Sequence, residues 1–186
     1  MSAAPAFDPR RLDVAAFART GAELAGTWPL AEMPRLLQDT LPPPDGAATV
    51  AWAVRGSSKP VAGGEPELRL HLHAGTTLRM CCQRCLQPVT VVLDVRPSLR
   101  FVRGESQAEA LDEAGDEDVL ALTAALDLRQ LVEDELILAL PLVPRHETCA
   151  EPLPMSAGDD AATAEAPSPA FATLASLLRD SPGKPN

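Results

Sequence analysis

Apolar and polar side chains alternate along most of the segment from residue 50 to residue 101. Strands that bury one face have this pattern, because successive side chains of a strand point to opposite sides of the sheet. The alternation predicts four strands. Their apolar positions are Val50, Trp52 and Val54; Leu68, Leu70 and Leu72; Leu78, Met80 and Cys82; and Val89, Val91, Leu93 and Val95, continued past Pro97 by Leu99 and Phe101.

Short segments separate these strands. GSSKP (56–60) and AGGEP (62–66) are rich in turn-forming residues, and AGT (74–76) is predicted to turn the chain between the second and third strands. Connections this short join neighbouring antiparallel strands. We therefore predict an α+β fold built on an antiparallel β-meander, as a curled sheet or a partial barrel.

Three segments have helical spacing instead. Residues 8–20 predict a short N-terminal helix, and residues 31–46 predict a second short helix that ends at a run of prolines. One long helix is predicted near 127–140, because Asp127 is a good N-cap and an apolar stripe follows it. The stripe consists of Leu128, Leu131, Val132, Leu136, Ala139 and Leu140.

Acidic residues are concentrated in the second half of the chain. Residues 105–118 carry seven acids and no base, which is typical of a solvated loop. Residues 118–124 predict one more strand. We expect Glu133, Asp134 and Glu135 to lie on the solvated face of the long helix rather than to form a catalytic carboxylate pair.

Charge and hydropathy bound the class of protein. The 186 residues have a formal net charge of −10, which argues against a general nucleic-acid coat, since such binding needs surplus Lys and Arg. No apolar run approaches the ~18 residues of a membrane span. The N-terminus lacks the pattern of a secretory signal. We expect a cytoplasmic protein with reduced thiols, no disulfide and no membrane partner.

The composition predicts one domain and a tail. Residues 1–149 form the single α+β domain, and residues 150–167, rich in acids, Pro and Ala, are predicted to be a disordered linker. Residues 168–180 predict a short C-terminal amphipathic helix. Its apolar edge either docks on the domain or binds a partner, and consists of Phe171, Leu174, Leu177 and Leu178.

Cysteines supply the main candidate for chemistry. Cys82 and Cys85 have C-x-x-C spacing, and His146 and Cys149 have H-x-x-C spacing just after the predicted long helix. Together they form a Cys3His set for a tetrahedral zinc ion. The alternatives are that Cys82 packs beside Met80 in the core, or that the C-x-x-C pair is a thiol-redox site, for which the expected helix context is absent.

Arginines suggest a second kind of site. Six lie between residues 68 and 103, and alternation places several of them on the side of the sheet opposite the apolar rows. Arg binds phosphate well, so the candidates for contact with RNA are Arg79, Arg84, Arg96 and Arg100. The alternative is a merely soluble face, partly paired with the acidic run.

Several of these features occur together in a known family. The motif CQRC, the string LVEDELILALPLVP with the following His146 and Cys149, and the C-terminal segment FATLASLLRD resemble the YceD family of large ribosomal RNA subunit accumulation proteins. The resemblance runs from about Arg79 to Arg179. It implies a role in the synthesis, processing or stability of the large-subunit (23S) ribosomal RNA of bacteria, and it implies no catalytic residues.

These observations favour a non-enzymatic ribosome-biogenesis factor, which acts on no small-molecule substrate. Its expected partners are precursor large-subunit ribosomal RNA, a large-subunit ribosomal protein, or both. The alternative is a zinc-binding or thiol-redox protein that uses the C-x-x-C motif. No catalytic residue is predicted, and zinc is the one cofactor that the sequence indicates.

Overall fold

The structure is a computed structural model that describes residues 7–42, 48–115 and 117–150. The chain divides into two units, Met1–Pro152 and Leu153–Asn186, and the described residues belong to the first. The predicted linker beyond residue 150 and the predicted helix at 168–180, with Phe171, Leu174, Leu177 and Leu178, lie outside the described residues. In the described part of the chain, no helix is long and apolar enough to cross a membrane.

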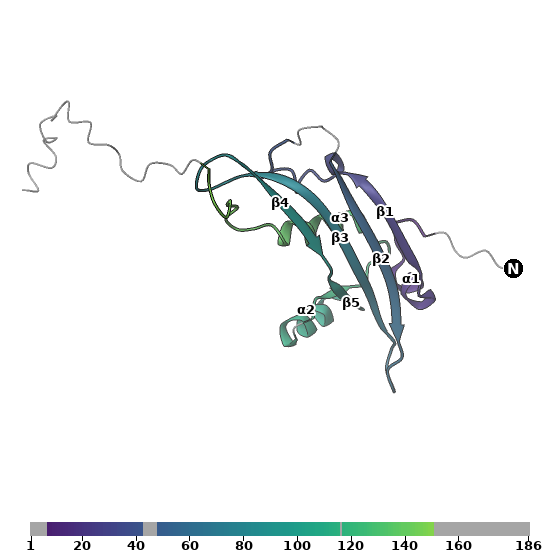
Figure 1. Cartoon of the computed structure of the whole chain (residues 1–186). Coiled ribbons are helices and arrows are strands. Elements are labelled where there is room, and N and C mark those ends of the chain that lie inside the picture. Colours follow the sequence, from purple (N-terminus) through teal and green to yellow (C-terminus); the bar gives the residue numbers. More distant parts are fainter. Residues whose placement is uncertain (1–6, 43–47, 116, 151–186) are drawn as a thin grey trace, which may run out of the picture. The chain divides into compact units, whose positions relative to one another are not determined.

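A six-stranded sheet is the centre of the fold (Figure 1). Its longest strand, β3, pairs with β2 along one edge and with both β5 and β4 along the other. All neighbours are antiparallel except β5 and β6, and the sheet does not close. The α+β fold with a curled, mostly antiparallel sheet is thus confirmed. The strands are β1 (Glu23–Pro29), β2 (Thr49–Lys59), β3 (Glu67–Cys81), β4 (Pro88–Val95), β5 (Ser98–Val102) and β6 (Val119–Ala121).

The turn predicted at residues 74–76 is wrong, because β3 runs through it without a break. Every second residue from Leu68 to Met80 is buried, so the two-residue period never slips. Gly75 lies within the sheet, where it pairs with Ala51 of β2 and with Asp94 of β4. The small residues at this place leave room for close neighbours and do not reverse the chain.

The turn predicted at 56–60 is also wrong at its start, since β2 continues to Lys59. Gly56 is a strand residue, and the helix α1 (Val14–Thr20) packs closely against it. A Cβ at Gly56 would lie 2.8 Å from the Cα of Ala18 and from the backbone oxygen of Phe17. The glycine is therefore needed for the close approach of a helix, not for a turn.

Helices α1 and α3 (Leu128–Leu138) lie against the sheet, and their buried residues share one core with it. Asp13 caps α1 by accepting a hydrogen bond from the Ala16 N–H, so this helix is shorter than the predicted 8–20. Asp127 caps α3 as predicted, and the buried stripe of α3 contains Leu128, Leu131, Val132 and Leu136. The segment at 31–46 forms only a short 3-10 turn (Leu30–Glu32) in its described part, where an α-helix was predicted.

Residues 105–114 of the acidic run form a helix and not the predicted loop. Helix α2 (Glu105–Ala114) connects β5 to β6 (Figure 1). These two strands are parallel, and parallel neighbours need a crossover connection, which is commonly a helix. Glu, Ala and Leu are good helix formers, and Ala108 packs inward while the carboxylates face solvent.

Glu133 also departs from the prediction, because it is buried and not solvated. Its carboxylate accepts hydrogen bonds from the backbone N–H groups of Arg35 and Leu36. These partners satisfy the charge inside the protein. Asp134 does lie at the surface, as predicted, and Glu135 is half-buried.

Candidate metal centre

The C-x-x-C motif forms the turn between β3 and β4. The Cys82 N–H donates to the Gln87 carbonyl at 2.9 Å, and the Leu86 N–H donates to the Cys82 carbonyl at 2.9 Å. These bonds hold both thiols of the motif on the inner side of the turn, where Cys82 and Cys85 are buried. Leu86 closes the turn with a positive φ of 60°, which is unusual for a residue other than glycine.

The H-x-x-C motif lies in the irregular segment that follows α3. A backbone hydrogen bond of 2.9 Å from the Gln83 N–H to the Pro144 carbonyl joins this segment to the C-x-x-C turn. Leu140, just after α3, packs against the cysteines. These contacts bring His146 and Cys149 to the end of β3, which is the arrangement that a single site requires.

The four predicted ligands converge. One ligand atom from each of Cys82, Cys85, His146 and Cys149 lies within 4.8 Å of all the others, so this group can hold a metal ion. The Sγ atoms of Cys82 and Cys149 are 3.8 Å apart, and the Cys85 Sγ is 3.4 Å from Nδ1 of His146. We call these four residues the cysteine cluster.

Burial and backbone hydrogen bonds act in opposite directions on the pKa of the Cys82 thiol. Burial raises the pKa of Cys82, but backbone N–H groups directed at its sulfur, led by those of Cys85 and His146, outweigh burial and lower the pKa to about 5. Burial, with hydrogen bonds to Cys85 and Cys82, raises the pKa of Cys149 to about 11. The cluster therefore stabilises a thiolate, the form of cysteine that binds metal ions.

Cys81 stands apart from the cluster although it is next to Cys82. Its side chain is on the other face of β3, where its thiol donates to the Leu86 carbonyl at 3.5 Å. All four cysteines of the chain are free thiols. Met80 and Val89 pack against the cluster from β3 and β4, so the predicted neighbour of Cys82 is also present in the core.

The four predicted arginines divide into two groups. Arg96 pairs with Asp94 at 3.1 Å, and Arg100 pairs with Glu67 at 3.1 Å. Arg79 instead donates to the Pro42 carbonyl, and Arg84 is exposed between Cys82 and Cys85. Within the described ranges, neither Arg79 nor Arg84 forms an ion pair with an acid.

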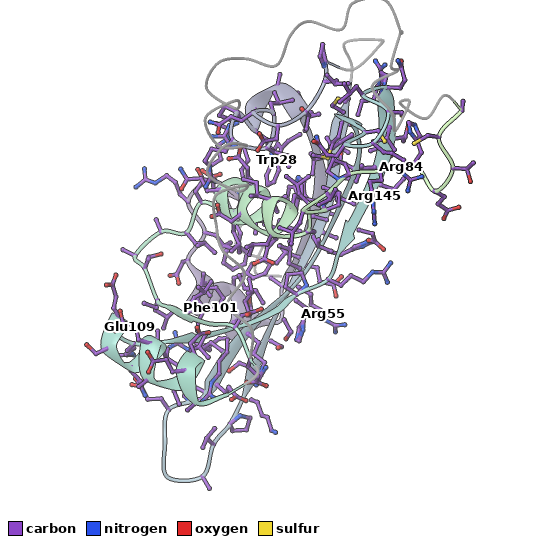
Figure 2. All side chains as sticks on the ribbon, turned by 90° about the vertical axis from the view of Figure 1, so that its left-hand side faces the viewer. Trp28, Arg55, Arg84, Phe101, Glu109 and Arg145 are labelled. Atoms are coloured by element: carbon purple, nitrogen blue, oxygen red, sulfur yellow. The ribbon has the colours of Figure 1, made fainter. Side chains whose placement is uncertain are left out.

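Arg145 joins Arg84 beside the cysteine cluster, and Figure 2 shows both arginines in the same region of the domain. Three large apolar side chains near them are exposed: Leu86 (61%), Leu142 (101%) and Val143 (55%). Exposed aliphatic residues next to arginines mark a candidate contact surface. We call it the cysteine-end surface, and it consists of Arg79, Arg84, Leu86, Leu142, Val143 and Arg145.

Sequence reasoning found only Arg79 and Arg84 of this surface. Leu86, Leu142 and Val143 read as ordinary apolar residues, because burial is the default for such side chains. The proline on each side of Leu142 and Val143 was a signal that α3 ends before them and that they lie on irregular chain.

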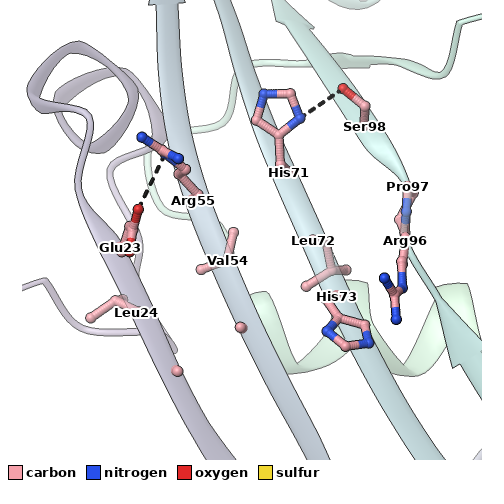
Figure 3. Close-up of a pocket in the computed structure, with 12 residues that line it drawn as sticks. Glu23, Leu24, Val54, Arg55, His71, Leu72, His73, Arg96, Pro97 and Ser98 are labelled. Atoms are coloured by element: carbon pink, nitrogen blue, oxygen red, sulfur yellow. Dashed lines mark hydrogen bonds and ion pairs between the residues drawn. The ribbon is translucent and has the colours of Figure 1, made fainter.

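The opposite face of the sheet carries a shallow hollow of about 530 Å³ (Figure 3). His71 and His73 are exposed there, and both form hydrogen bonds with neighbouring side chains. The ring of His71 bonds Ser57 and Ser98, and His73 bonds Asp94. Hydrogen bonds from His73 and Arg96 hold the pKa of Asp94 below its usual range. The polar side chains of the hollow are therefore paired with neighbours, and apolar residues such as Leu24 and Leu72 line the rest of it.

Comparison with known proteins identifies sequences that are similar to this chain. The profile of the family described as large ribosomal RNA subunit accumulation protein YceD matches residues 70–178. A curated relative of that name from Haemophilus influenzae is 40% identical over 67 residues, which cover 36% of this chain and 38% of the relative. No solved structure matches the chain.

The family profile spans more than half of the chain and includes the whole cysteine cluster, Arg84 and Arg145. The resemblance that the sequence motifs indicated is therefore confirmed by an independent match. The chain belongs to the YceD family of large ribosomal RNA subunit accumulation proteins.

Proposed function

We propose that this protein is a non-enzymatic factor that supports the synthesis, processing or stability of large-subunit (23S) ribosomal RNA in the bacterial cytoplasm. The observation that carries the proposal is the family match over residues 70–178, since the family's description names the accumulation of the large ribosomal RNA subunit. The match favours this role over a zinc-binding or thiol-redox function as the main activity.

The cysteine-end surface is our candidate for the contact with large-subunit precursors. Arg84 and Arg145 project from the two halves of the cysteine cluster, and Arg79 lies on the last part of β3. Guanidinium groups that are not engaged by carboxylates are free to bind phosphate oxygens. Before they could bind phosphate, Arg96 and Arg100 would have to break their ion pairs with Asp94 and Glu67.

Precursor ribosomal RNA is the partner that we propose for these arginines. The net charge of −10 opposes general attraction to RNA, so the contact must be local and directed. A large-subunit ribosomal protein is the alternative partner, which the exposed Leu86 and Leu142 would fit better. The test below separates the two.

Binding without catalysis agrees with the chemistry of the described residues. His71 and His73 are engaged on the sheet face, and His146 belongs to the cysteine cluster. The buried carboxylate of Glu133 already accepts hydrogen bonds from backbone N–H groups. A metal ion in the cluster would then be a structural part of the binding surface and not a catalyst.

The test is co-sedimentation of the full chain with large-subunit precursors from cells that lack the protein. The double variant Arg84→Glu/Arg145→Glu should lose most of the association. The control Arg55→Glu/Arg103→Glu changes the charge equally at two exposed arginines that pair with Glu23 and Glu65, and should keep it.

Each outcome decides one part of the proposal. Binding of the parent to protein-free precursor RNA supports RNA as the partner, and binding that needs a ribosomal protein supports the alternative. Equal binding by both double variants would remove the cysteine-end surface from the proposal. Normal levels of 23S RNA in cells that lack the protein would contradict the function itself.

A further inference from the structure

We propose that two copies of this chain pair through the outer edge of β4, so that their six-stranded sheets join into one continuous antiparallel sheet. The proposal is independent of the ribosomal function. It rests on the unpaired backbone groups of β4, on the apolar side chains that this strand leaves exposed, and on the match of its sequence with itself when two copies run antiparallel.

Within the described residues, β4 pairs with β3 alone and lies at the border of the sheet (Figure 1). The Cys82 N–H donates to the Gln87 carbonyl just before β4, and the Leu72 N–H donates to the Pro97 carbonyl just after it. In an antiparallel ladder, residues bonded in this way alternate with residues whose backbone groups point to the other side. The odd-numbered residues of β4 therefore bind β3, and the even-numbered ones direct their N–H and C=O groups outward. The outward residues in the middle of the strand are Thr90, Val92 and Asp94.

The outward backbone groups on either side of this stretch already have partners. The Pro88 carbonyl lies 3.2 Å from Nε2 of His146. Beyond the other end, in β5, the Arg100 N–H donates to the Asp118 carbonyl at 2.9 Å. In the described part of the chain, no backbone hydrogen bond covers the outer edge of residues 90–94. Unpaired N–H and C=O groups of this kind form a template for another strand.

The side chains of β4 are incompletely buried on both faces of the sheet. Val92, on the face opposite α3, is 72% exposed, and Val91, on the core face, is half-buried. The central part of β4, VTVVL, carries no charge, although charged residues commonly protect sheet edges. The edge strand β1, by contrast, contains Gly26 and ends at Pro29, which both weaken strand pairing. Of these two edges, β4 is therefore the one suited to receive another strand.

The sequence of β4 matches itself in one register. When two copies cross at Val92, this residue faces its counterpart, and Thr90 of each copy faces Asp94 of the other. All three outward residues are then paired, with about six backbone hydrogen bonds. Sliding the strands by two residues in one direction puts Pro88, which has no N–H, opposite Asp94. Sliding them in the other direction puts Thr90 opposite Arg96, which lies beyond the end of β4.

Charges at this edge do not oppose the pairing. In the register centred on Val92, the Asp94 carboxylate faces the Thr90 hydroxyl, which donates hydrogen bonds, and not a second carboxylate. Arg96 and His73 bind the same carboxylate within each chain. Cross-strand valine pairs and pairs that form hydrogen bonds both stabilise antiparallel strands. The paired stretch is short, so we expect micromolar and not nanomolar affinity.

Other occupants of this edge make different predictions. A strand from another protein would leave the purified chain monomeric. A segment of this chain outside the described residues would protect the edge from hydrogen exchange at every concentration. A second copy gives protection that rises with concentration and an affinity that depends on the two charges that meet at position 92.

The experiment is sedimentation equilibrium of the untagged, full-length chain in reducing buffer, which excludes disulfide-linked dimers. We expect a reversible dimer with a Kd of about 10–100 µM. Val92→Lys and Val92→Glu should each weaken it at least about tenfold, because like charges then face each other. An equimolar mixture of the two variants should dimerise at least as well as the parent. Val61→Lys is the control, since Val61 is 48% exposed but lies in a turn outside the sheet.

Hydrogen exchange of the parent chain tests the edge without any substitution. The amides of Thr90, Val92 and Asp94 should exchange at least about threefold more slowly at ~500 µM than at ~5 µM protein. The proposal is overturned by a chain that stays monomeric at ~500 µM, by equal affinity of the parent and Val92→Lys, or by a variant mixture that does not dimerise. Protection of these three amides that is the same at both concentrations would also overturn it.

Discussion

Glu133 binds Arg35 through both the backbone and the side chain of the arginine, across 98 positions of sequence. One carboxylate oxygen accepts from the Arg35 N–H at 2.7 Å and from the Leu36 N–H at 3.1 Å. The other accepts from the guanidinium at 3.0 Å. This carboxylate thus fastens the segment that carries the fully buried Met33 and Leu36 onto α3.

Removing this carboxylate should be strongly destabilising. We expect Glu133→Ala to lower the free energy of unfolding by about 2–5 kcal/mol, because it leaves the backbone N–H groups of Arg35 and Leu36 without their acceptor. Asp134→Ala is the control, since Asp134 binds the same arginine at the surface and should cost less than about 1 kcal/mol. Urea titration measures both, and equal effects would show that burial of Glu133 is unimportant.

The packing of α1 on the sheet depends on the absence of a Cβ atom at Gly56. We expect Gly56→Ala to cost about 1–3 kcal/mol, because its Cβ would meet the backbone of α1 at 2.8 Å and the helix would have to move. Gly64→Ala is the control, since its Cβ would meet only the Val61 side chain at 3.6 Å. Thermal and urea unfolding of the two variants compare the costs, and similar stability would mean that α1 shifts freely.

Glu135 should make stability depend on pH. Burial, and after it the charges of Asp118 and Asp134, raise the pKa of this carboxyl in the folded state. A folded pKa above the unfolded one favours folding while the group is protonated, and this contribution is lost as the pH rises through the folded pKa.

Glu135→Gln should therefore raise the free energy of unfolding at pH 7 by about 0.3–0.5 kcal/mol, the size typical of partly exposed charges. The gain should vanish below about pH 4, where the carboxyl is protonated in both states. Urea titrations at the two pH values check this. A gain of the same size at both would assign the effect to packing and not to charge.

Features set by local sequence were predictable. The buried rows of β2 and β3 follow from the two-residue period, and α3 follows from Asp127 and its apolar stripe. The spacing of two short motifs was enough to select the four residues of the cysteine cluster, and the fold brings their ligand atoms within 4.8 Å of one another. The sequence could not show that α3 and β3 end near each other, because this proximity depends on the packing of the whole domain.

Features set by distant partners were not predictable. Glu133 resembles its solvated neighbours in sequence, and only Arg35 and Leu36 explain its burial. Residues 105–114 of the acidic run form α2 because β5 and β6 pair in parallel and need a crossover. At Gly75, composition indicated a turn, while the unbroken alternation on both sides indicated a strand, and the alternation was the stronger signal.

Leu86 has both a strained backbone conformation and an exposed apolar side chain. A substitution at this position therefore tests the cysteine-end surface directly. Its φ of 60° places a branched side chain in the left-handed region, and that side chain is 61% exposed. Strain of this kind persists where the surroundings impose it and often marks a functional position. Glycine adopts the same backbone conformation without the steric cost.

We therefore expect Leu86→Gly to affect stability and binding in opposite directions. The free energy of unfolding should rise by up to about 1 kcal/mol, because relief of the left-handed strain outweighs the added freedom of the unfolded chain. Association with large-subunit precursors should fall, because the exposed side chain is gone. Weaker binding by a more stable protein cannot be attributed to unfolding, whereas unchanged co-sedimentation would exclude Leu86 from the contact surface.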